Sequence, residues 1–243
     1  MKGGIFIICL IISFLLSDLS FAQNSKSYRV VYKPKVRISV DTLTGPSDFV
    51  SILKSSIKKT EQTQFILTIS NEVSNFKQSG ELRLEVSVID KVSIPQLAGV
   101  KGEYINDGKS IFHSCEIANT PITVNLKSKI DWLLTQERKS IQGYVCYKAS
   151  GIRLYGRNKG QSVVVWYTPE VPVSFGPKEY YGLPGLILEV DEKDVSLTAV
   201  KIEPTKPITI EIPNKRILSE KEAEKLRESE NRKAEDFMNI KNK

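Results

Sequence analysis

The amino-acid sequence predicts a mainly β protein: a single domain built on one curved antiparallel sheet, with one or two helices that include a C-terminal helix. Apolar and polar residues alternate along much of residues 23–214, which is typical of strands with one buried face. Turn sequences such as Asn106-Asp107-Gly108 separate these runs and favour antiparallel hairpins. The runs also lack the intervening helices that a parallel sheet requires.

Segments with strand-like composition follow one another through the chain, and residues 81–88 alternate without interruption between polar and apolar side chains. The composition, with 40% hydrophobic and 26% charged residues, is that of a globular chain rather than a disordered or collagen-like one. The predicted strands are Tyr28–Lys33, Gln64–Ser70, Leu82–Ile89, Glu103–Asn106, Ile111–Ile117, Ile122–Leu126, Trp132–Thr135, Ile141–Lys148, Ser162–Tyr167, Leu186–Val190, Val195–Ile202 and Ile208–Ile212.

Two segments have helical spacing. After Ser47, the predicted N-cap, apolar residues recur every three to four positions up to Ile57, which predicts a helix with a strand as the alternative. Ser219 and Glu222 form the pattern of a capping box, and residues 220–240 contain neither Gly nor Pro. The apolar face of this tail is thin, so the tail either docks at one end or is a solvated, charged appendage.

The first 22 residues have the pattern of a signal peptide. A basic Lys2 precedes an apolar run from Ile5 to Leu16, and Ser20-Phe21-Ala22 then supplies small residues before a cleavage site. As a helix this run would span roughly 18 Å, which is too short for a hydrocarbon core of about 30 Å.

This N-terminus predicts the domain organisation and the compartment. We expect a signal peptide over residues 1–22, a β-rich domain over residues 23–218 and a charged C-terminal helix over residues 219–243. Gln23 stands where a bacterial lipid anchor would need a cysteine. The exported protein is therefore expected in the periplasm or associated with the outer membrane, without a transmembrane segment after cleavage.

Export also changes the interpretation of the cysteines. Cys115 and Cys146 remain after cleavage, and in an oxidising compartment two lone cysteines form a candidate disulfide. Two unlinked buried thiols are the alternative, because Cys packs as a small hydrophobic residue. A reactive redox pair is less favoured, because the spacing is unlike that of a Cys-x-x-Cys motif.

The formal net charge of +7 is concentrated in one part of the chain. Lys148, Arg153, Arg157 and Lys159 lie close together in the sequence with no acidic residue among them, and they form a candidate contact for an anionic partner. A solvated basic face is the alternative. Nucleic acid is not expected as a partner outside the cytoplasm.

The sequence offers little material for catalysis. His113 is the single histidine, and no G-x-S-x-G motif is present, so a hydrolase would have to be built on His113. Cys115 would share a strand face with His113, and an enzyme using this pair is an alternative to an ordinary sheet histidine. With no second histidine and no phosphate-binding loop, we predict a non-enzyme with no catalytic residues, no metal site and no cofactor.

The most distinctive stretch, residues 165–190, is rich in Pro, Gly and aromatic residues. Pro184-Gly185 has the composition of a type II turn, flanked by Leu183 and Leu186. The prolines upstream predict an extended crossing segment rather than a helix. The stretch is either a rigid connector between strands or a contact for a ligand that is built from Trp166, Tyr167, Tyr180, Tyr181 and Leu183.

Residues 182–187 spell GLPGLI, and the chain resembles the GLPGLI protein family of Bacteroidota over residues 132–190. The resemblance implies an exported protein but no established activity, so it transfers no catalytic or binding residue. The motif residues, with a structural role or a possible role in contacts, are Trp166, Tyr167, Pro169, Pro172, Gly176, Pro177, Gly182, Leu183, Pro184, Gly185, Leu186 and Ile187.

These observations favour an exported, non-catalytic binding or accessory protein. Its sheet would be similar, by analogy, to the half-barrel carriers of bacterial lipoproteins, with a concave face that holds an apolar ligand or a lipidated partner. The first alternative is an interaction partner of an outer-membrane transport or secretion system. The second is an enzyme of unknown type that uses His113 and Cys115.

Overall fold

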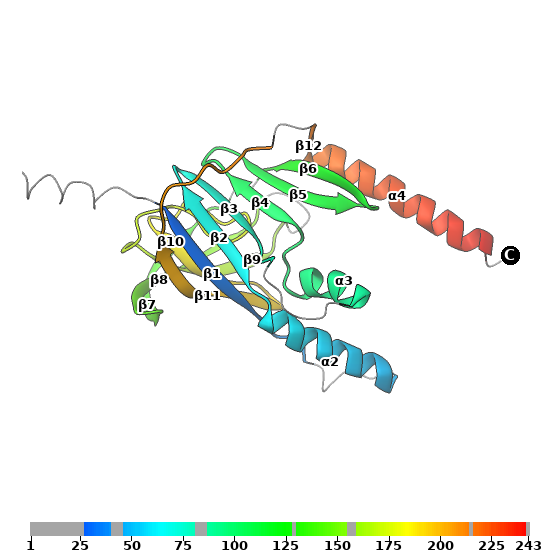
Figure 1. The fold of residues 1–243 in the computed structure, drawn as a ribbon, viewed down its shortest axis with the longest axis horizontal. Coiled ribbons are helices and arrows are strands. Elements are labelled where there is room, and N and C mark those ends of the chain that lie inside the picture. The colour runs from blue at the N-terminus through cyan, green and yellow to red at the C-terminus, as the bar shows by residue number, and fades with distance from the viewer. Residues whose placement is uncertain are drawn as a thin grey trace, which may run out of the picture.

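The computed structural model describes residues 27–39, 46–80, 87–127, 130–154, 159–213 and 216–241. Over these residues the protein is mainly β, with one open, curved sheet of twelve strands and three helices (Figure 1). The strands lie in the order β12-β6-β5-β4-β3-β2-β1-β11-β10-β9-β8-β7. The predicted fold class is therefore confirmed, although the sheet is mixed because β12 pairs with β6 in parallel.

Five of the eleven connections between consecutive strands are short turns, and the others are helices or longer segments. The bounds of the strands are β1 (Tyr28–Val36), β2 (Phe65–Ser70), β3 (Val73–Gln78), β4 (Glu103–Asn106), β5 (Ile111–Ile117), β6 (Thr120–Leu126), β7 (Leu133–Ile141), β8 (Tyr144–Ile152), β9 (Ser162–Thr168), β10 (Leu186–Asp191), β11 (Val195–Pro204) and β12 (Ile217–Ser219). The helices are α2 (Ser47–Gln62), α3 (Val88–Leu97) and α4 (Glu220–Lys241). The predicted signal peptide lies outside the described residues.

Some predicted strands are wrong. The segment Ile208–Ile212 pairs with none of the strands that the structure describes, and it is held at Ile208, whose backbone N–H donates to Ser70 Oγ over 2.9 Å. The alternating run at residues 82–89 ends in a helix: Val88 and Ile89 begin α3, and residues 82–86 lie outside the described part. Ser87 and Asp90 form a capping box there, which favours helix over strand.

Two strands were not predicted, and one boundary is shifted. β3 follows a turn in which Asn71 and Glu72 adopt positive φ without a glycine, so the usual turn signal is missing. β12 is only three residues long. The β7–β8 hairpin turns at Gln142-Gly143, where both residues have positive φ, and not between the predicted segments Trp132–Thr135 and Ile141–Lys148.

Both predicted helices form. α2 begins at Ser47, but Pro46 occupies the N-cap position, so Ser47 is not the cap. At α4 the capping box is confirmed: Glu222 N donates to Ser219 Oγ over 3.3 Å, and Ser219 N donates to Glu222 Oε2 over 2.8 Å. Ala223 is fully buried against β5 and β6, so the tail docks at its N-terminal end, and Figure 1 shows its remainder extending beyond the sheet.

The main core lies on one face of the sheet and includes the crossing segment between β9 and β10. Alternate residues Val171, Val173 and Phe175 are buried in it, together with side chains of β1, β2, β3, β10 and β11. The start of β10 hydrogen-bonds to this segment, because Leu186 N and Ile187 N donate to Val171 O and Phe175 O, each over 3.0 Å. The extended crossing is therefore confirmed, and it is packed as part of the core.

The Pro184-Gly185 corner is tighter than the predicted type II turn. Gly185 N donates to Leu183 O over 2.8 Å, which closes a three-residue turn, and the φ of Gly185 is 155° rather than near 80°. A Cβ on Gly185 would lie 2.1 Å from Thr168 O. Only glycine permits this close approach of the corner to the end of β9.

Gly185→Ala should therefore destabilise the fold much more than Gly182→Ala, its control just before the turn. Gly182 also has a positive φ, of 87°, but a Cβ there meets nothing within 4 Å. We expect a loss of roughly 1–2 kcal/mol for Gly182→Ala from backbone strain, and about 3 kcal/mol or more for Gly185→Ala from the added backbone clash. Urea unfolding of both variants measures the difference, and equal losses would contradict this account.

Candidate functional site

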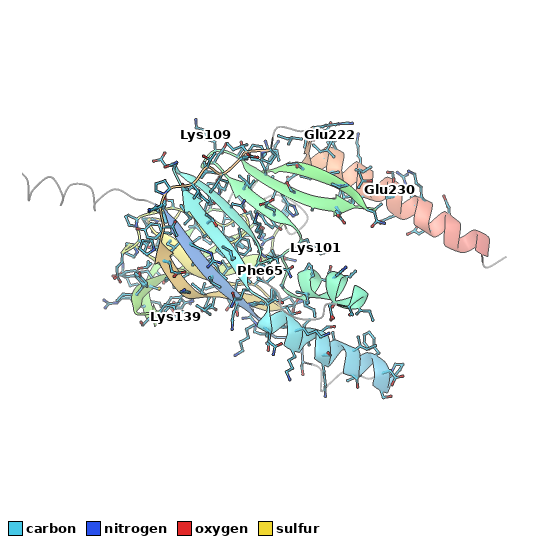
Figure 2. The ribbon with its side chains drawn as sticks, in the orientation of Figure 1. Phe65, Lys101, Lys109, Lys139, Glu222 and Glu230 are labelled. Carbon is cyan, nitrogen blue, oxygen red and sulfur yellow. The ribbon has the colours of Figure 1, made fainter. Side chains whose placement is uncertain are left out.

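An open groove with a volume of about 1590 Å³ lies along β3, β4, β5 and β6. Segment 209–213, Pro95 of α3 and Arg227 of α4 complete its walls. Figure 2 shows Lys101 in the space between α3 and the β5–β6 hairpin. The side chains that line the groove are mixed: the apolar ones include Ile105, Pro121, Ile122, Ile210 and Ile212, and the charged ones are Lys77, Lys101, Glu103, Glu116, Glu211, Arg216 and Arg227.

Gly102 shapes the groove because it brings the chain that enters β4 against β5. A Cβ on Gly102 would lie 2.0 Å from Ser114 O, and its φ is 89°. The chain turns away at this point, so the pairing of β4 with β5 begins only at Glu103, which lies opposite Ser114. β5 continues beyond β4 to Ile117, where it is paired with β6 alone.

His113 and Cys115 both line the groove, but they do not form an activated pair. The His113 ring stacks on Tyr104 with ring centroids 4.2 Å apart, and its Nε2 donates to the carbonyl of Lys101. Burial lowers the pKa of His113 and raises the pKa of Cys115, although Arg227 and Lys101 partly offset the latter. A neutral imidazole and a protonated thiol suit hydrogen bonding and packing rather than nucleophilic attack.

Several charges of the groove are already partnered. Glu103 accepts hydrogen bonds from Lys77 Nζ over 3.0 Å and from Asn75 Nδ2 over 2.7 Å. Arg227 lies 3.4 Å from the Glu224 carboxylate on the same helix. By contrast, no carboxylate of the described residues forms an ion pair with Lys101. The groove therefore offers one unpaired ammonium close to a weakly paired guanidinium.

The predicted disulfide is not formed: Cys115 and Cys146 are both free. Cys115 lies on β5 and Cys146 lies on β8, and seven strands separate β5 from β8 in the sheet order. The Cys146 side chain is fully buried in the main core, and burial raises its pKa to about 11. The alternative interpretation of the pair is two unlinked buried thiols that pack as small hydrophobic residues. Cys146 fits this interpretation.

The four residues predicted as an anionic contact do not come together as one surface. Lys148 Nζ lies 2.9 Å from Glu137 Oε1, and Arg153 is turned into an internal ion cluster. Arg157 lies outside the described residues, and Lys159 is exposed near that gap. Antiparallel pairing places Glu137 near Lys148, which the local sequence does not reveal.

The ion cluster joins Arg153 to the crossing segment and to the β10–β11 turn. Arg153 lies 2.9 Å from Glu179 and 2.5 Å from Glu192, and Lys178 lies 2.6 Å from Glu192. The Tyr180 hydroxyl also donates to Glu192 and accepts from Arg153. Burial alone would raise the pKa of Glu192, but the charges of Lys178 and Arg153 and the hydrogen bonds outweigh it and lower that pKa. The cluster is charge-balanced, so its role is structural.

Most side chains of the GLPGLI stretch are buried rather than presented to a ligand. Leu183 is 2% exposed, and Leu186 and Ile187 are completely buried. Trp166 is partly buried and lies under the ammonium of Lys139, 4.4 Å from the ring centroid. The buried motif residues are Tyr167, Gly176, Pro177, Leu183, Gly185, Leu186 and Ile187, whereas Pro169, Pro172, Gly182 and Pro184 are exposed.

Two further properties bear on the function. Among the described residues, no group of three or more His, Cys, Asp or Glu side chains is placed to hold a metal ion. None of the helices in the described part of the chain is both long enough and apolar enough to cross a membrane.

Residues 153–189 match a Bacteroidota-associated family described as "Protein of unknown function (Porph_ging)". The matched stretch contains the ion cluster except Glu192, and the whole crossing segment between β9 and β10. It covers well under half of the chain. None of the curated proteins compared with the chain is similar to it.

Among solved structures, the chain is similar to PNGF-II in two space groups, with 14% and 16% identity and TM-scores of 0.49 and 0.47. These matches cover 81% and 79% of this chain but 31% of the PNGF-II chain, so the chain spans about a third of the length of PNGF-II. The LolA superfamily protein NE2245 from Nitrosomonas europaea is 10% identical, with a TM-score of 0.29 over 78% of this chain and 88% of its own.

The free thiols should be distinguishable by alkylation. Iodoacetamide should modify Cys115 slowly in the folded protein, because its side chain is only partly buried and its pKa is raised, and it should leave the fully buried Cys146 unmodified. After unfolding without a reductant, intact mass measurement should show both cysteines modified. A non-reduced, unfolded protein that takes up no label would demonstrate a disulfide instead.

Glu192→Gln should destabilise the protein by about 3–5 kcal/mol, because it leaves Arg153 and Lys178 without their shared carboxylate. Glu203→Gln is the control: Glu203 is an exposed partner of Arg29 at 3.8 Å, and we expect a loss of at most about 1 kcal/mol.

The effect of Glu192→Gln should also depend on pH. Because the folded-state pKa of Glu192 lies below its ordinary value of 4.5, the carboxylate stabilises the fold above that pH, and this stabilisation is lost as the pH falls through the folded-state pKa. Denaturant unfolding of wild type and variant should therefore give free energies that converge in acid. A constant difference from pH 7 to pH 3 would show that the charge of Glu192 is irrelevant.

Proposed function

We propose that this protein is an exported, non-catalytic binding or accessory protein of the periplasm or outer membrane, and that its partner binds in the groove along β3–β6. The observation that carries the proposal is the groove itself. Its volume of about 1590 Å³ exceeds the roughly 300–1,000 Å³ of typical small-molecule pockets. A long ligand or a segment of a partner fits such a site better than a compact metabolite.

The groove also replaces the concave face as the place for an apolar or lipidated partner. Around the GLPGLI turn, Leu183, Leu186 and Ile187 are at most 2% exposed and pack against the protein's own core. By contrast, Ile212 is 44% exposed in the groove, and Ile122 and Ile210 also line it. Apolar parts of a partner would be bound by these isoleucines.

The protonation states of His113 and Cys115 support binding rather than catalysis. The signal-peptide pattern of residues 1–22 supports export, and the GLPGLI stretch supports membership of that family. An association with an outer-membrane transport or secretion system is a second candidate function. It is favoured by α4, which docks by its first turns and extends beyond the sheet (Figure 1).

Blocking the groove tests the proposal. We expect that the full chain, purified from its native periplasm, carries a bound mass in native mass spectrometry. Thr123→Trp, on the groove wall, should lose that mass because the indole fills the site. Ser162→Trp, at the exposed start of β9, is the matched control and should retain it. Circular dichroism checks that both variants fold, and retention of the mass by folded Thr123→Trp would refute the groove as the site.

A further inference from the structure

We propose that the groove takes an extended polypeptide segment, which adds as a strand beside the end of β5 and carries acidic side chains at alternate positions. This inference rests on the proposed function, because it names the class of partner for the same groove. Two features carry it: an unpaired stretch of backbone on β5, and the separation of charge between the two faces of that strand.

The backbone of β5 is open on one side near its end. The carbonyl of Ser114 points toward Gly102, on the side of β4. Residues two apart in a strand direct their backbone groups to the same side, so Glu116 also directs its N–H and C=O toward the side of β4. β4 has no residue paired with Glu116, since the pairing stops at Ser114. An open strand edge of this kind is where an extended peptide adds.

The other side of the β5–β6 hairpin keeps this edge in place. β5 and β6 pair without interruption from Ile111 opposite Leu126 to Ile117 opposite Thr120. Ile117 and Val124 pack against Ala223 of α4, which fixes the hairpin against the helix. The edge at Glu116 is therefore a rigid template, so an incoming strand need not order it on binding.

Charge differs between the two faces of β5. His113 and Cys115 lie on one face, and Ser114 and Glu116 lie on the other, because side chains alternate. Lys101 and Arg227 belong to the face of His113 and Cys115: the carbonyl of Lys101 accepts from His113 Nε2, and α4, which carries Arg227, packs by Ala223 on Ile117 and Val124 of that face. On the opposite face, Glu103 lies opposite Ser114 and is paired with Lys77, so the two charges cancel, and Glu116 adds a carboxylate.

This separation of charge favours partners with a particular order of acidic and neutral residues, and not merely partners with a negative net charge. Four cationic side chains and three carboxylates line the groove, so its total charge hardly favours an acidic partner. A bound strand that directs acidic side chains toward Lys101 and Arg227, and neutral ones toward Glu116, satisfies both faces. Because strand side chains alternate, the acidic residues of the partner must occur at every second position.

Two other features favour a polypeptide over an acyl chain and β5 over the outer edge. Lys101, Glu116 and Arg216 line the groove, and an acyl chain laid over them would take charged groups out of water without giving them partners. The outer edge of the sheet, β7, is interrupted by a register shift between Leu134 and Arg138, a feature that protects strand edges from pairing.

Synthetic peptides test the pattern directly. The probe is a fluorescein-labelled, eight-residue peptide in which Glu and Thr alternate, and the control peptide has the same composition with four Thr followed by four Glu. Fluorescence anisotropy with the full chain at low ionic strength should show tighter binding of the alternating peptide, by about fivefold. Hydrogen exchange should show new protection of the Glu116 amide when this peptide is bound.

Variants locate the contact. The double variant Lys101→Gln with Arg227→Gln should weaken binding of the alternating peptide by roughly three- to tenfold, as expected for two partly exposed charge contacts. Lys109→Gln is the matched control, because Lys109 is an exposed lysine in the β4–β5 turn outside the groove lining (Figure 2). It should leave the affinity unchanged.

The outcomes separate this inference from the proposed function. Equal binding of the two peptides, or a double variant that binds as well as Lys109→Gln, would overturn the strand inference. If Thr123→Trp abolishes a native bound mass that proves to be a lipid, the strand inference is also overturned, while the groove remains the binding site. If Thr123→Trp changes neither the native mass nor peptide binding, both proposals fail.

Discussion

The Glu192 carboxylate is the interaction on which much of this fold depends. It accepts charge-assisted hydrogen bonds from Arg153 at the end of β8 and from Lys178 in the crossing segment, and a further hydrogen bond from Tyr180. Three segments far apart in the sequence meet at this one group. Their side chains are largely buried, so the charges must balance internally, because removing one partner leaves an uncompensated charge in a poorly solvated place.

The ion cluster also reaches toward the groove. Lys178 Nζ lies 3.4 Å from the carbonyl of Gly99, in the connection between α3 and β4. Three residues later Gly102 brings the same connection against Ser114, and Lys101 lies between these two points. The position of Lys101 at the groove is thus fixed from both sides, on one by the ion cluster and on the other by the close approach of Gly102 to β5.

The sequence is sufficient for the fold class because alternation and turn residues are local signals. It fails where structure depends on partners distant in the chain. Asn71 and Glu72 make a hairpin turn without glycine, so the turn signal for β3 is missing, and Ile208–Ile212 alternates like a strand although it pairs with no strand among the described residues. The groove was not predicted either. Its walls come from β3–β6, segment 209–213 and α4. Of the residues that line it, only His113 and Cys115 are candidate functional residues by sequence alone.

The GLPGLI stretch and the proposed binding site have different roles: the first stabilises the fold, and the second is proposed to bind a partner. The GLPGLI stretch is distinctive because Gly185 lies against Thr168 and Leu186 and Ile187 fill the core, which are constraints of packing. Side chains used in this way have no surface left to offer a partner. Recognition therefore has to depend on residues outside the stretch, such as Lys101 and Arg227, whose charges lie at an open groove. The GLPGLI stretch thus stabilises the fold, and the residues around β5 determine which partner the groove binds.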